Sequence, residues 1–151
     1  PITNFPSYEE FFEVTDGIYY YDVRNTAIDK LKYRLTKINE SKGVIFDNRG
    51  RPQNEVHVLL QHLTGFNINS SKWMIPRITE PDFTNVEFKE GEIWDLPPLE
   101  PQIRTNVVFL TNARAVSYGE SIMAIIKNYK LGTIIGERTA GTNGNTNHSQ
   151  A

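Results

Sequence analysis

The sequence contains no cysteine, which excludes disulfides, thiolate catalysis and cysteine-ligated metal sites. It also has no excess of positive charge, because 16 Lys and Arg residues stand against 18 Asp and Glu residues without a basic stripe. Neither nucleic acid nor an anionic membrane surface is therefore expected as a partner. No apolar run approaches the roughly 20 residues of a membrane span, and no signal-peptide pattern opens the chain. We expect the chain as given to be soluble.

The length of 151 residues is typical of one domain, and a domain of this size can bury about two-thirds of its unfolded surface. We expect residues 1–151 to form a single domain. Neither Pro1 nor Ala151 lies in a segment that resembles a natural start or a completed final element. The domain is therefore expected to be incomplete at both ends.

Two strand patterns flank a helix pattern in the first third of the chain. Ile18 to Val23 is rich in aromatic and β-branched residues and predicts a strand. The amphipathic helix that follows reaches Glu40 and is expected to be capped by Thr26, while Gly43 to Asp47 predicts a second, buried strand. Such a β-α-β unit favours parallel pairing with a right-handed crossover. Apolar spacing from Val56 to Leu63 predicts a further helix.

A second unit of this kind lies near the end of the chain. Val107 to Leu110 predicts a buried strand, Gly119 to Lys130 an amphipathic helix, and Thr133 to Ile135 another strand. Ser117 therefore falls at a strand-to-helix corner. A hydroxyl at such a corner points away from the sheet, close to the next backbone N–H groups and the positive end of the helix dipole. This placement suits a serine nucleophile.

Ser117 has a second interpretation. The run Ser117-Tyr118-Gly119-Glu120 also fits a capping box, in which the Glu120 side chain returns to the Ser117 N–H. Helix-starting serines are far more common than nucleophiles, so the local pattern alone favours the cap.

Residues 66–102 interrupt the alternation of strands and helices. Ser71 to Thr79 and Phe83 to Lys89 are compatible with the strands of a hairpin or flap. The proline-rich run from Leu96 to Pro101 predicts a stiff extended connector. We expect this insertion to be either a substrate lid or a structural arm.

Two motifs in a fixed order carry a family resemblance. The first is GVIFDNRGRP, from Gly43 to Pro52; the second, from Val107 to Gly144, holds Ser-x-x-Glu and then Gly-Glu-x-Thr-x-Gly-x-x-Gly. Together they resemble the D-x-R-G-N-x-G-G and S-x-x-E elements of the carboxyl-terminal processing (tail-specific) and tricorn-core serine peptidases. The resemblance covers most of Gly17 to Asn145. It implies an α/β fold, a ClpP/crotonase-like β/α superhelix with a mainly parallel sheet and crossover helices.

The same resemblance implies roles for particular residues. Ser117 matches the family nucleophile, and the backbone N–H of Tyr118 matches one donor of the oxyanion hole. The second donor falls near Gln53 and Asn54, where the family pattern has glycines that permit close approach. Supporting positions around the site fall on Asp47, Arg49, Gly50, Glu120 and Thr142.

The general base departs from the family pattern. In the tail-specific branch a lysine occupies the position of Thr142, and an uncharged hydroxyl cannot take a proton from Ser117 at neutral pH. The loop at 141–145 is closer to the tricorn-like branch, which takes a histidine from an earlier segment and an acidic residue from a later one. We therefore expect a nucleophile without its base in this chain. His57, near a helix start, and His148 in the tail are the substitutes within the sequence.

The resemblance implies a serine endopeptidase that acts on a peptide or unfolded protein. The alternative is a non-catalytic peptide- or ligand-binding member of the same fold. His57 and His62 are five residues apart, which is not the spacing that places two imidazoles on one metal, so neither a metal nor a cofactor is expected. Because relatives of this kind are often exported in bacteria, a periplasmic or extracytoplasmic location is expected.

Overall fold

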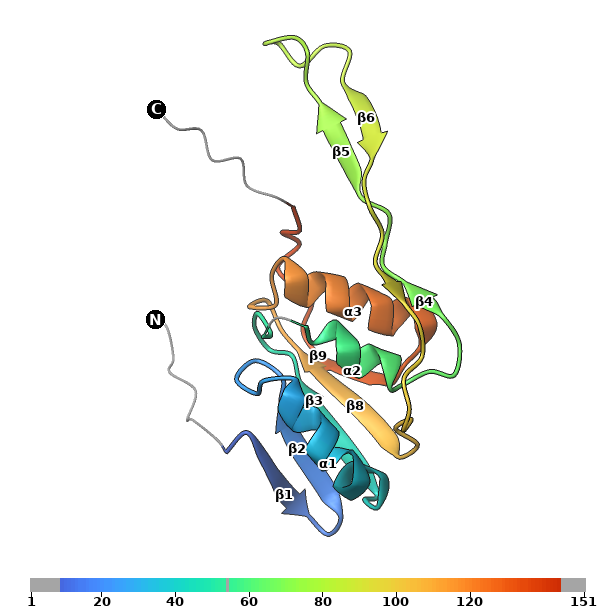
Figure 1. Cartoon of the computed structure of the whole chain (residues 1–151). Helices are drawn as coiled ribbons and strands as arrows, with labels where there is room; N and C mark the ends of the chain where they lie inside the picture. Colours follow the sequence, from blue (N-terminus) through green and yellow to red (C-terminus); the bar gives the residue numbers. More distant parts are fainter. Residues whose placement is uncertain (1–8, 54, 145–151) are drawn as a thin grey trace, which may run out of the picture.

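The protein, a computed structural model that describes residues 9–53 and 55–144, is centred on a five-stranded sheet (Figure 1). Its strands, in spatial order, are β1 (Phe11–Thr15), β2 (Ile18–Asp22), β3 (Gly43–Asp47), β8 (Asn106–Thr111) and β9 (Thr133–Gly136). The last four pair in parallel, whereas β1 folds back antiparallel on β2 through Gly17, which has a φ of 79°. This mainly parallel α/β sheet confirms the predicted fold class.

Three helices cover one face of the sheet: α1 (Asp29–Asn39), α2 (His57–Gln61) and α3 (Tyr118–Tyr129) (Figure 1). Leu35 of α1, Leu60 of α2 and Ile126 of α3 are buried in a common core with the sheet. Phe46 of β3 and Phe109 of β8 stack there with ring centroids 5.4 Å apart. Each such buried apolar side chain contributes roughly 1.5–3 kcal/mol relative to exposure. The core therefore fixes β3 and β8, the two strands with which the sequence motifs begin.

The predicted cap of the first helix is wrong. Helix α1 begins at Asp29, and its N-cap position is Ile28, which makes no side-chain cap hydrogen bond. Thr26 instead lies in the turn after β2, where its N–H donates to the Asp22 carbonyl at 3.1 Å. The turn that follows the end of β2 places Thr26 ahead of the N-cap position, so the local sequence pattern did not determine the cap of α1.

No helix of the described residues covers the opposite face of the sheet (Figure 1). Residues paired across adjacent strands point to the same face, as do alternate residues along one strand. The register therefore places four apolar or aromatic side chains on this uncovered face: Tyr20, Ile45, Val108 and Leu110. Ile135 of the edge strand β9 lies beside Leu110 and is 52% exposed. Apart from Asp22 and Asp47, which register places at its carboxyl end, this face is mainly apolar, and it is partly open to solvent at β9.

The insertion at 66–102 forms an arm. Near the body, β4 (Ile68–Asn69) pairs with β7 (Asp95–Leu96); beyond them, β5 (Met74–Arg77) pairs with β6 (Glu87–Glu90). The outer hairpin projects from the body (Figure 1). The expected pair of insertion strands is thus confirmed, although both are shorter than predicted. Within the described residues, no helix is long and apolar enough to cross a bilayer.

Candidate active site

Ser117 occupies the corner between β8 and α3 in a strained backbone conformation. Its φ is 51° and its ψ is −113°, a combination that residues with a Cβ rarely adopt. A strained serine on a sharp strand-to-helix turn directs its Oγ outward, as in the nucleophile elbow of other hydrolases. Half-buried Ser117 lines an open cleft of about 870 Å³ together with Arg51, Val116 and residues 141–144.

The predicted capping box is present, with both of its halves. The Ser117 N–H donates to Glu120 Oε2 at 3.1 Å, which is the Glu120 half of the box. The Ser117 side chain lies at the Glu120 N–H, which is the other half of the box, although this N–H also donates to the Ser117 carbonyl at 2.9 Å and no side-chain cap hydrogen bond of full geometry forms. Ser117 therefore begins the helix and lines the cleft in the same structure.

Glu120 ties the glycine-rich loop to the helix. Its Oε1 accepts the Gly141 N–H at 2.6 Å, while Ser117 N–H reaches both Glu120 Oε2 and the Thr142 carbonyl, the latter at 3.0 Å. Burial acts to raise the Glu120 pKa, but hydrogen bonds from the Thr139 side chain and from backbone N–H groups outweigh it, so the pKa lies below its ordinary value. An ionised Glu120 thus holds one wall of the cleft.

Gly119 brings the first motif against the second. A Cβ placed on Gly119 would lie 2.8 Å from the Gly50 carbonyl oxygen and 3.2 Å from Pro52 Cδ. Asn48 reinforces this approach, because its Nδ2 donates to the Gly119 carbonyl at 3.2 Å. The turn after β3 therefore packs on the first turn of α3, beside Ser117.

A buried charge network holds that turn. Asp47, whose side chain is fully buried, accepts hydrogen bonds from Arg49 Nε and Nη2 at 3.0 and 2.8 Å and from the Tyr20 hydroxyl at 2.5 Å. Arg24, paired with Asp22 at 2.6 Å, lies 3.5 Å from Asp47. Burial acts to raise the Asp47 pKa, but bonds from Arg49 and Tyr20 and the Arg24 charge bring it below the ordinary value. Arg49 therefore points back to the strand end rather than into the cleft.

The predicted oxyanion donors differ in availability. Among the described residues, no hydrogen bond uses the Tyr118 N–H, which lies in the first turn of α3, where N–H groups have no intrahelical partner. The Gln53 N–H donates to the Val23 carbonyl at 3.2 Å, so it would have to leave that bond to serve an oxyanion. Asn54 lies outside the described residues.

The base candidates within the chain are held elsewhere. The Tyr118 hydroxyl lies 2.9 Å from both the His57 N–H and the His57 Nδ1, and both rings lie near Trp94. Burial lowers the His57 pKa despite the Glu55 charge, and burial raises the Tyr118 pKa. Residues 9–53 and 55–144 contain no hydrogen bond between Ser117 Oγ and a histidine or lysine.

The remaining predicted residues are also placed. His62 Nδ1 lies 2.9 Å from the Pro101 carbonyl, at the foot of the arm. Thr142 lines the cleft and contributes its carbonyl to the Ser117 N–H. His148 lies outside the described residues. The described part of the chain holds no group of three or more His, Asp or Glu side chains that could bind a metal.

Among the cleft residues to which the sequence reasoning gave no role, Arg51 and Asn143 have polar side chains. Arg51 is exposed, and within the described residues it forms no ion pair. Its position directly after Arg49-Gly50 was a usable signal, because supporting residues and the second oxyanion donor were predicted in the same turn. Asn143 donates from Nδ2 to Ser121 Oγ at 2.9 Å, a contact between loop and helix that no local pattern encodes.

Comparison with known proteins shows the family and the fold of this chain. The model of a family described as peptidase family S41 matches residues 18–150. Two similar solved structures are a candidate peptidase from Parabacteroides merdae and the photosystem II D1 C-terminal processing protease. The first has a TM-score of 0.65 at 18% identity over 88% of this chain and 44% of its own length. The second has a TM-score of 0.54 at 18% identity over 83% and 31%. A search of curated proteins finds no match.

Proposed function

Since this chain belongs to peptidase family S41, we propose that it supplies the nucleophile and one oxyanion donor of a serine endopeptidase site. The observation that carries the proposal is the backbone of Ser117, strained at φ 51° on the edge of an open cleft. Strain of this kind costs about 1–3 kcal/mol and persists where surrounding contacts impose it. Here those contacts are the Glu120 carboxylate and the Thr142 carbonyl, both bonded to the Ser117 N–H.

The chemistry follows from these groups. Ser117 Oγ attacks the carbonyl carbon of a peptide bond, and its proton passes to a base. The carbonyl oxygen, now carrying the negative charge, accepts the Tyr118 N–H at the positive end of α3. The amine leaves with a proton, and water then hydrolyses the acyl-enzyme. No cofactor takes part in these steps.

The base is proposed to come from a part of the protein outside residues 1–151. The chain spans less than half the length of the two solved structures. Removing the base of a triad costs several orders of magnitude in rate. The 151-residue chain is therefore expected to hydrolyse an unstructured peptide at or near the background rate. Robust turnover that Ser117→Ala abolishes would contradict this and would direct attention to His57 as a base within the chain.

A boronic acid tests the nucleophile separately from turnover. A boronate accepts a serine Oγ and becomes tetrahedral, so it needs no leaving group. We expect phenylboronic acid to give a tetrahedral ¹¹B signal with the 151-residue chain and none with Ser117→Ala. Ser41→Ala is the matched control, since Ser41 lies after α1 with its Oγ bonded to the Ile38 carbonyl. Equal signals from the chain and Ser117→Ala would reject the nucleophile.

A non-catalytic, peptide-binding member of the family is the second candidate. It is supported by the absence, within the described residues, of a histidine or lysine bonded to Ser117 Oγ. The boronate experiment separates the two functions, because a binding module has no reason to keep a reactive hydroxyl. Peptide binding without a Ser117-dependent tetrahedral signal would favour the second candidate.

We also propose a cellular location for the protein, by analogy with its relatives. The resemblance to exported bacterial peptidases supports a periplasmic or extracytoplasmic site of action. Fractionation of the full-length protein tests this, and recovery in the cytoplasm would contradict it.

A further inference from the structure

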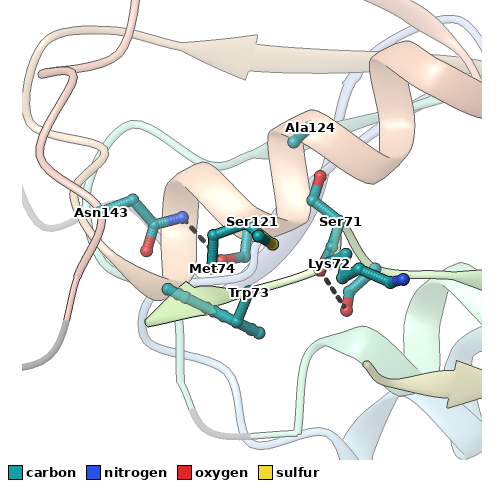
Figure 2. A pocket seen from close by; sticks show the side chains of 8 residues that line it. Ser71, Lys72, Trp73, Met74, Ser121, Ala124 and Asn143 are labelled. Atoms are coloured by element: carbon teal, nitrogen blue, oxygen red, sulfur yellow. Dashed lines mark hydrogen bonds between the residues drawn. The ribbon is translucent and has the colours of Figure 1, made fainter. Parts of the chain in front are cut away.

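A second hollow lies beside the Ser117 cleft, between the foot of the arm and α3 (Figure 2). Its volume is about 290 Å³, and its lining consists of Ser70, Ser71, Lys72, Trp73, Met74, Ser121, Ala124 and Asn143. The hollow and the cleft share Asn143, whose side chain is bonded to Ser121. Ser121 lies four residues after Ser117, one turn further along the same helix. The two depressions are therefore adjacent and follow the direction of α3.

The arm presents an unpaired strand edge to this hollow. In the β5–β6 ladder, Met74 lies opposite Glu90, and the Gly91 N–H donates to the Trp73 carbonyl at 2.8 Å. Opposed residues in an antiparallel pair alternate between bonded and non-bonded positions, so the Met74 N–H and C=O point away from β6. No residue of β6 lines the hollow, whereas Met74 of β5 does, which agrees with a hollow on the unpaired side of β5.

Pro76 occupies the next position on the same edge. A proline has no N–H to donate and is tolerated in a sheet only where that N–H would face outward. Its presence agrees with an unpaired edge at alternate residues 72, 74 and 76. Because Pro76 has no N–H, the only hydrogen-bond donor that the outer edge of β5 can offer to a further strand is the Met74 N–H.

We propose that an extended peptide substrate adds as a strand to the Lys72–Met74 edge, places one side chain in the hollow and leads the scissile bond to Ser117. This inference rests on the proposed function. Pairing through backbone groups suits an unfolded chain, because it recognises extended conformation rather than sequence. The hollow selects a medium-sized apolar side chain, since Trp73, Met74 and Ala124 line it, with the Ser121 hydroxyl at its side.

Helix and strand geometry fix the spacing of this subsite. Ser117 and Ser121 are about 6 Å apart along the helix axis, at roughly 1.5 Å per residue. A strand advances about 3.3 Å per residue, so the side chain in the hollow belongs to a residue about two positions from the scissile bond. Only one apolar position close to the cleavage site should therefore control affinity.

Fluorescence anisotropy of a labelled unstructured peptide with the 151-residue chain tests the edge. Met74→Pro removes the N–H at the strand edge. The control Met74→Ala shortens the side chain but keeps this N–H. We expect Met74→Pro to weaken binding about tenfold more than Met74→Ala, the usual effect of one lost hydrogen bond. Methylating single amides of the peptide should weaken binding at alternate positions only. This second measurement uses the unmodified chain and decides the matter if Met74→Pro does not fold.

Equal binding by Met74→Pro and Met74→Ala, or methylation effects without alternation, would overturn the strand-edge proposal. Phenylboronic acid distinguishes that failure from failure of the proposed function, because it is too small to need the arm. A Ser117-dependent tetrahedral signal without edge dependence leaves the nucleophile intact and removes the docking edge. Edge-dependent binding without that signal would support the docking edge and reject Ser117 as the nucleophile.

Discussion

At the scale of single residues, Ser117 combines a cap with a strained corner. Its N–H is shared between the Glu120 carboxylate and the Thr142 carbonyl, which leaves the backbone little freedom. An ordinary N-cap has a φ in the β region, whereas Ser117 has a φ of 51°. The capping pattern was therefore correct about the contacts of Glu120 but silent about the conformation of the serine.

This difference yields the first prediction, which concerns stability. Ser117→Ala and Ser117→Gly both lose the hydroxyl, but only glycine adopts a positive φ without cost. We expect Ser117→Gly to be more stable than Ser117→Ala by about 1 kcal/mol in urea unfolding. A simple cap gives a different order, in which Ser117→Ala loses about 1 kcal/mol and Ser117→Asp restores it. Equal stability of the Gly and Ala variants would argue against the strained conformation.

Glu120 supports a prediction about pH. Its folded-state pKa is lowered, so its contribution to stability is present above the ordinary glutamate pKa and is lost as the pH falls through the lowered value. The free energy of unfolding should therefore fall more steeply with decreasing pH in the wild type than in Glu120→Gln, between about pH 5 and pH 3. Glu87→Gln, an exposed change in β6, serves as the control and should follow the wild type.

At the scale of secondary-structure elements, the site depends on how closely α3 approaches the turn after β3. Only Gly119 allows the helix to lie against the Gly50 carbonyl, and the Asn48 side chain bridges the two. The Asp47–Arg49 pair holds the turn from the other side. Two segments about 70 residues apart in sequence are thereby joined around Ser117.

Gly119→Ala tests this contact. Alanine favours a helix by about 1 kcal/mol over glycine, but its Cβ would lie 2.8 Å from a backbone oxygen that cannot move without shifting the turn. Overpacking of this kind typically costs about 1–3 kcal/mol, so we expect net destabilisation in urea unfolding together with a weaker boronate signal. Asn128→Ala, on the exposed side of the same helix, should be neutral or slightly stabilising. A stabilised Gly119→Ala would show that the contact is not tight.

The parallel strands and helices could be predicted from the sequence because their apolar periods are local. Strand β1 could not, because Phe11–Thr15 has no clean alternation and is held by pairing with β2 and by Phe11 stacking on Tyr19, with centroids 5.2 Å apart. The Thr26 cap failed where a tertiary turn overrode a local pattern. The bond between Gln53 N–H and the Val23 carbonyl joins two loops, and no spacing in the sequence encodes it.

At the scale of the whole molecule, the body and the outer arm differ in how their residues are buried. The body holds one core beneath three helices, whereas all residues of β5 and β6 are exposed. Phe83, near the tip of the arm, is 66% exposed, and Phe88 is 60% exposed. Because these apolar side chains are exposed, they contribute little to the stability of the body.

The last prediction removes the outer arm. Residues 76–88 are replaced by Asn-Gly, which joins Ile75 to Lys89, a hydrogen-bonded pair that suits a two-residue hairpin. Because the deleted residues lie outside the core, the free energy of unfolding should change by less than about 1 kcal/mol, whereas Leu35→Ala in α1 should cost about 2–5 kcal/mol. Binding of an apolar dye should also fall, since Ile78, Phe83 and Phe88 are lost. A loss of stability comparable to that of Leu35→Ala would mean that the arm is part of the folding unit, and its exposed apolar residues would then need a structural explanation.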